Sequence, residues 1–192
     1  MDFRNAKELL KVCQEQNLSI SAVMLQRELT EGEQDPEETD RKMDRVLEIM
    51  KSAASTPIHT PVKSMGGLIG GEAKKISDHK DAGKSLCGDL LERAVIYAMA
   101  TLETNASMGV IVASPTAGSA GIVPGLLLAL QETYDLSDEQ IKQGLYNASE
   151  IGYLAMRNAT VAGAVGGCQA EVGICLLYTS PSPRDMRRSR MP

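Results

Sequence analysis

The chain has 192 residues, of which 43% are hydrophobic and 23% are charged, a balance that is ordinary for one soluble domain with a sizeable core. Aromatic residues make up only 3%, which disfavours a β-sandwich or barrel and favours closely packed helices. The net charge of −5 disfavours nucleic acid and anionic membranes as partners. We expect a mainly α fold with Gly-rich loops and at most one short β segment.

Three amphipathic helices are predicted in residues 1–54. Apolar residues recur at helical spacing from Ala6 to Cys13, which places the Cys13 thiol on the apolar face. A second helix is predicted at about residues 21–29. A third begins at Asp35, where an N-cap residue precedes a proline and two glutamates. We interpret these helices as an N-terminal packing module without chemistry.

Residues 55–84 are expected to form a long connection. They contain two prolines, five glycines and both histidines, and they show no helical period. His59 and His79 are therefore interpreted as solvated loop residues, although a loop histidine near a site can act as an acid or base.

The third predicted part, residues 85–173, bears the candidate site. A helix is expected after Ser85 that ends before Asn105, and the β-like run 110–113 follows it. Another helix opens with the capping box 137–140 and continues to about Arg157. Cys87 follows a leucine with a buried pattern, so packing is its expected role.

The segment from Ser114 to Gly125 is a polar, glycine-rich turn that leads into an apolar helix. It offers the hydroxyls of residues 114, 116 and 119, and Gly118 and Gly121 should leave backbone amides accessible. Such a turn suits a small anion, for example a carboxylate or a phosphate. An ordinary turn between two elements remains the alternative, because Gly and Pro mark turns everywhere. Asn105 is expected to place its side-chain amide beside this turn.

Cys168 is the thiol with the most open setting, because it is flanked by small residues that let a metal or cluster approach. A buried, inert cysteine is the alternative. Glu171 would lie on nearly the same helical face as Cys168, where its carboxylate could accept a hydrogen bond beside the metal ligand or act as a base. A surface carboxylate is the alternative.

Residues 174–192 differ in character from the rest of the chain. They carry four Arg and one Asp, a net charge of +3, so residues 1–173 carry −8. Residues 176–185 resemble translated sequencing-adapter sequence. We expect a non-native or disordered tail on a truncated chain, and we discount Cys175 within it. The four cysteines lack paired spacing and the first residues are charged, which predicts a reducing, cytoplasmic location with no membrane span.

Two long segments, Gly88 to Gly125 and Gly163 to Gly173, together resemble the alpha chain of the iron-sulfur-dependent L-serine dehydratases. The resemblance extends over residues 1–173. It implies a lyase, L-serine ammonia-lyase, that converts L-serine to pyruvate and ammonia in amino-acid catabolism and gluconeogenesis. It also implies a helical catalytic domain and a 4Fe-4S cluster held by three cysteines.

By this resemblance Cys168 is the first metal ligand, and the other two cysteines belong to a later region that this chain lacks. Ser114, Thr116 and Gly118 become candidates for holding the substrate, with Asn105 in support. No residue is assigned as the base. The resemblance further implies a separate beta chain and an oligomer, and we expect this chain to be inactive alone.

Two other functions each fit part of the sequence. A pyridoxal-phosphate dehydratase could use the Ser114 turn as a phosphate cradle, but it needs a Schiff-base lysine, and the lysines between residues 63 and 84 follow no strand. A non-catalytic helical binding module could use the glycine-rich turns for close packing, but it has no reason to keep them polar.

Overall fold

The computed structural model describes residues 3–32, 35–85, 87–114 and 116–158. Within these residues the chain forms seven helices and no strand, so the mainly α prediction is confirmed. The helices are α1 Ala6–Gln16, α2 Ile20–Glu31, α3 Pro36–His59, α4 Glu72–Asp81, α5 Asp89–Ala106, α6 Ile122–Tyr134 and α7 Asp138–Asn158. The β-like run 110–113 pairs with no other described segment.

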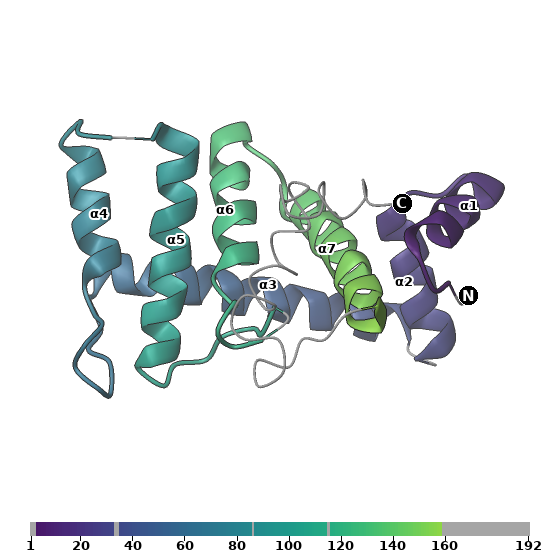
Figure 1. Ribbon diagram of the computed structural model, residues 1–192, viewed down its shortest axis with the longest axis horizontal. Coiled ribbons are helices and arrows are strands. Elements are labelled where there is room, and N and C mark those ends of the chain that lie inside the picture. The colour runs from purple at the N-terminus through teal and green to yellow at the C-terminus, as the bar shows by residue number, and fades with distance from the viewer. Residues whose placement is uncertain (1–2, 33–34, 86, 115, 159–192) are drawn as a thin grey trace, which may run out of the picture.

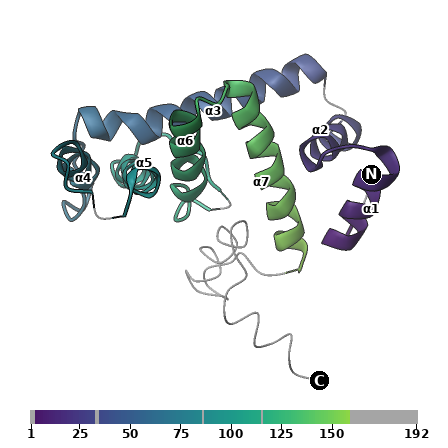
Figure 2. The same cartoon turned by 90° about the horizontal axis from the view of Figure 1, so that it is seen from above.

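The long helix α3 runs across one side of the molecule (Figure 1). Helices α4, α5 and α6 stand side by side against it, and α7 follows them (Figure 2). Helix α2 packs on α7, and α1 packs on α2 at the far end. No helix in the described part of the chain combines the length and the apolar composition that crossing a bilayer requires.

Two apolar clusters hold this arrangement together. Leu47 and Met50 of α3 pack with Ile141 and Leu145 of α7, all at most 4% exposed. The second cluster joins the N-terminal helices to the end of α7 and contains Phe3, Leu9, Val23 and Leu154. Cys13 packs against the second cluster, as its place in the apolar pattern predicted. Cys87, by contrast, is exposed, so the packing prediction for it is wrong.

Helix α3 continues past residue 54 in spite of Pro57. A proline inside a helix leaves the carbonyl oxygen of the fourth preceding residue without its usual donor. Here that oxygen belongs to Ala53, and the Thr104 hydroxyl of α5 donates to it at 2.8 Å. The helix therefore extends to His59, which is its last residue and not part of a loop.

Helix α4 corrects the second half of the predicted connection at residues 55–84. Its sequence is polar, and Ala73 is its one buried residue. No side chain of its own segment caps it, since Gly71 occupies the N-cap. Instead the buried Glu103 of α5 accepts the Ala73 amide hydrogen at 2.8 Å. A tertiary contact thus replaces the local capping signal, and His79 is helical.

Candidate functional site

The polar turn between α5 and α6 is closed by one buried side chain. Ser119 is 2% exposed, and its hydroxyl donates to the Ser114 carbonyl oxygen at 2.9 Å. The Thr116 hydroxyl lies 3.2 Å from the same Ser119 oxygen. A buried hydroxyl with these partners fixes the backbone around it, because leaving the partners unpaired costs about 1–3 kcal/mol. The turn is therefore a defined structure.

Asn105 ties this turn to α5. Its side-chain amide donates to the Ala117 carbonyl oxygen at 3.1 Å. The structure thus brings Asn105 to the turn, as the sequence predicted. The helix, however, does not end before Asn105, since α5 continues to Ala106. The side chain reaches across from the last turn of a helix.

The glycines of the turn have different surroundings. Gly118 is exposed, in line with an accessible backbone. Gly121 is buried, and an added Cβ would lie 2.5 Å from the Ala98 carbonyl oxygen of α5. At Gly125 the corresponding contact is 2.7 Å, to the Ala94 carbonyl oxygen. The expected accessibility of Gly121 is therefore wrong, because this glycine serves the close packing of α6 on α5. Helix α6 also begins earlier than predicted, at Ile122.

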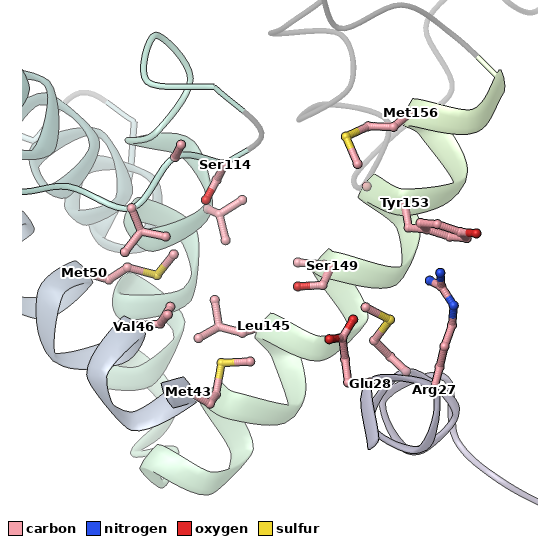
Figure 3. A pocket seen from close by; sticks show the side chains of 16 residues that line it. Arg27, Glu28, Met43, Val46, Met50, Ser114, Leu145, Ser149, Tyr153 and Met156 are labelled. Atoms are coloured by element: carbon pink, nitrogen blue, oxygen red, sulfur yellow. The ribbon is translucent and has the colours of Figure 1, made fainter. Parts of the chain in front are cut away.

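Ser114 lines a cavity of about 490 Å³ between α2, α3, α6 and α7 (Figure 3). We call this cavity the α2–α7 groove. Its polar side chains are Ser114, Ser149, Tyr153, Arg27 and Glu28. The remaining lining residues are mostly apolar: Met24, Met43, Val46, Met50, Val112, Ala113, Val123, Leu145, Ala148, Gly152 and Met156. The turn thus faces an apolar cavity with a few polar groups, which is typical of a binding site.

Arg27 and Glu28 bring polar side chains of the predicted N-terminal module to the α2–α7 groove. The Arg27 guanidinium stacks 3.6 Å from the Tyr153 ring centroid and forms a 3.1 Å ion pair with Glu31. Both α2 side chains reach the groove because α2 packs on α7. No local sequence signal marks these residues, since the contact joins segments more than a hundred residues apart.

A buried carboxyl group lies next to the groove wall. Glu150 of α7 is fully buried, and neither of its carboxyl oxygens has a hydrogen-bond partner among the described residues. Burial raises the pKa of Glu150 to about 7. The Arg27 guanidinium lowers this pKa and the Glu28 carboxylate raises it, both to a smaller extent. Near neutral pH this side chain is poised between its acid and its base form.

The metal prediction falls on Cys168, which lies outside the described residues, as do Glu171 and Cys175. In the described part of the chain, no three His, Cys, Asp or Glu side chains gather closely enough to hold a metal ion.

His59 borders a second cavity of about 320 Å³, which is also lined by Lys80, Arg93, Tyr97 and Glu132. The ion pair between Lys80 and Asp89 links α4 to α5 there, and Arg93 pairs with the same Asp89 carboxylate within α5.

Comparison with known proteins gives one consistent family. The serine dehydratase alpha chain family matches residues 15–176. A protein of Bacillus subtilis named "Probable L-serine dehydratase, alpha chain" is 44% identical over 171 residues, which are 89% of this chain and 57% of that protein. The L-serine dehydratase alpha chain of Peptoniphilus asaccharolyticus is 39% identical, over 89% of this chain and 59% of its own length. An L-serine dehydratase of Helicobacter pylori is 33% identical, over 90% of this chain and 39% of its own length.

These matches define the class of protein: the chain belongs to the serine dehydratase alpha chain family. It spans rather more than half the length of the two alpha-chain relatives. The Ser114 turn, Asn105 and the α2–α7 groove all lie within the matched residues.

Proposed function

We propose that this chain supplies part of a lyase that converts L-serine to pyruvate and ammonia. Membership of the serine dehydratase alpha chain family supports the proposal. So do relatives named L-serine dehydratase, both with and without a chain label. Because the chain spans 57–59% of the alpha-chain relatives, the complete activity is assigned to a larger assembly.

Ser114, Thr116 and Gly118 are proposed to hold the serine carboxylate, with Asn105 as a positioning residue. The observation that carries this proposal is the Asn105–Ala117 hydrogen bond, which fixes the turn against α5 beside the groove. Hydroxyls and accessible backbone amides are suitable donors to a carboxylate. The turn also lies just before the N-terminus of α6, which favours negative charge.

A 4Fe-4S cluster is the proposed cofactor, with Cys168 as one ligand. The described residues do not fit a cluster by themselves: Cys13 is packed in the N-terminal core, and Cys87 is exposed on a different segment. Further ligands would have to come from beyond the described residues. When bound, a cluster with an open iron supplies a Lewis acid for the substrate hydroxyl.

The proposed reaction is a β-elimination. The α-proton of serine leaves to a base and the hydroxyl group leaves as water, which gives aminoacrylate. Aminoacrylate tautomerises to the imine, and water hydrolyses the imine to pyruvate and ammonia. The contribution of the described residues is to hold the carboxylate still during the elimination, because correct orientation lowers the barrier.

A separate beta chain is the proposed partner, and an oligomer in the cytoplasm is the proposed setting. The name "alpha chain" carried by two relatives supports a second chain. The Helicobacter pylori relative, whose name carries no chain label, supports it too, since this chain covers only 39% of that protein. We propose that these 192 residues have no serine dehydratase activity alone.

Two assays test this function. In the first, the 192-residue chain is reconstituted anaerobically with iron and sulfide and assayed for pyruvate, and no turnover is expected. In the second, the matched segment of this chain replaces its counterpart in the Bacillus subtilis alpha chain, and this chimaera is co-expressed with the beta chain. Serine-dependent pyruvate from the chimaera is the expected result. A folded chimaera without activity would contradict the proposal.

A further inference from the structure

The α2–α7 groove has an apolar lining that is only partly covered. Met43, Met50 and Leu145 form its floor, and Met156 at its rim is 51% exposed (Figure 3). Flexible methionine side chains adapt to whatever packs on them. An open apolar groove of this size indicates a site where another polypeptide segment or a ligand packs.

We propose that residues 159–173 of this same chain fill the α2–α7 groove. Helix α7 ends at Asn158, two residues after Met156, so the segment begins at the rim of the groove. Eleven of its fifteen residues are Ala, Val or Gly, and Glu171 is its one charged residue. Small apolar side chains of this kind suit a groove that is lined by large ones.

The family match supports one folded unit that contains both the groove and the segment. It covers residues 15–176 without interruption, and therefore includes every element that lines the groove as well as residues 159–173. A single apolar core per domain is the rule, and a segment rich in Ala, Gly and Val that is attached to an open part of that core completes it at little entropic cost. Neither the docking nor its test depends on the proposed activity.

Methionine oxidation in the full 192-residue chain tests the docking. Dilute hydrogen peroxide is applied, and mass spectrometry follows the oxidation of each methionine. Met65 and Met108 lie away from the groove at 80% and 79% exposure and serve as internal references. From exposure alone, Met156 should react less than about two-fold more slowly than Met65. With the segment docked, we expect it to react at least about five-fold more slowly.

Two pairs of substitutions identify the occupant. Val161→Asp with Val165→Asp should raise the Met156 rate to that of Met65, whereas Leu176→Asp with Leu177→Asp, outside residues 159–173, should leave it unchanged. If the Asp pair unfolds the protein, Val161→Thr with Val165→Thr is used, and a partial rise in the Met156 rate is expected.

Three results would overturn the proposal. One is a Met156 rate within two-fold of Met65 in the unaltered chain. Another is protection of Met156 that survives the substitutions at residues 161 and 165. The third is protection that disappears on dilution, which would identify a second copy of the chain as the occupant.

Discussion

The side-chain amide of Asn105 donates a 3.1 Å hydrogen bond to the carbonyl oxygen of Ala117, and so fastens the polar turn to α5. The bond spans twelve residues and joins the last turn of α5 to the turn that precedes α6. Much of the proposed function depends on this one contact, because it fixes where the hydroxyls of the turn lie.

Replacement of Asn105 by Asp should therefore impair the proposed site. The Asp carboxylate cannot donate, and it would face the Ala117 carbonyl oxygen with a like partial charge. In the chimaera we expect kcat/KM for serine to fall by about ten-fold to a hundred-fold, since a small misplacement of a binding group is costly. Asn105→Gln, which keeps the amide on a longer side chain, should recover part of the activity. Equal activity of the Asp variant and the unaltered chimaera would contradict the role.

Ser119 should stabilise the chain more than an exposed serine does. Ser119→Ala removes the donor to the Ser114 carbonyl oxygen in a buried setting, and should lower the free energy of unfolding by about 1–3 kcal/mol. Ser85→Ala, at an exposed position between α4 and α5, is the matched control and should change it by less than about 0.5 kcal/mol. Urea unfolding of the 192-residue chain measures both values. A similar loss for the two variants would disprove the closing role of Ser119.

Gly121 should tolerate no side chain. The added methyl group of Gly121→Ala would meet the Ala98 carbonyl oxygen at 2.5 Å and push α6 away from α5. Overpacking of this kind costs about 1–3 kcal/mol. Gly66→Ala is the control, because its added Cβ would have no neighbour within 4 Å. Thermal unfolding of the two variants compares the costs, and equal melting temperatures would show that α5 and α6 are not in close contact.

Glu150 should make stability fall as the pH rises. Its pKa is raised to about 7 in the folded protein, so between about pH 4.5 and pH 7 the folded state binds more protons than the unfolded state. The contribution of Glu150 to the free energy of unfolding is therefore most favourable below this window, and it decreases as the pH rises through the window. Across the window we expect the free energy of unfolding to fall by up to about 3 kcal/mol because of this group.

Glu150→Gln should remove this contribution, because the amide does not titrate. The difference in unfolding free energy between the variant and the unaltered chain should therefore shift in favour of the variant between pH 5 and pH 8. Glu37→Gln, an exposed carboxylate in the first turn of α3, is the control and should show no such shift. Parallel stability curves for the Glu150 variant and the unaltered chain would show that Glu150 does not titrate in this range.

Glu103 should hold the N-terminus of α4. Glu103→Ala removes the acceptor for the Ala73 amide hydrogen, whereas Glu103→Gln retains an oxygen at the same position. We expect the Ala73 amide to exchange with solvent at least about ten-fold faster in the Ala variant than in the Gln variant, because the capped turn opens more often. Hydrogen exchange followed by NMR measures this, and the same exchange rate in both variants would show that the cap comes from elsewhere.

Local patterns predicted most of the helices. The capping box is present, with the Gln140 amide donating to the Ser137 hydroxyl and the Ser137 amide donating to the Gln140 side chain. Asp35 caps α3 through the Glu38 amide. Both signals work because capping residues and the groups they satisfy lie within one turn of each other.

Long-range contacts explain what the sequence did not predict. Helix α3 continues past Pro57 because the Thr104 hydroxyl donates a hydrogen bond to the Ala53 carbonyl oxygen. Helix α4 is capped by the Glu103 carboxylate, which belongs to α5. In the site, the sequence indicated the polar turn and Asn105, but not Arg27, which enters through the packing of α2 on α7. Such contacts have no spacing that a single sequence reveals.

The measurement that tests the central claim most directly is serine-dependent pyruvate formation by the chimaera with and without Ser114→Ala. If the chain forms part of a serine dehydratase and the turn holds the substrate, the chimaera makes pyruvate. The Ser114 variant should then lose about a hundred-fold in kcat/KM, with its melting temperature changed by less than about 4 °C. A folded chimaera that makes no pyruvate, or a Ser114→Ala chimaera as active as the unaltered one, would contradict the account.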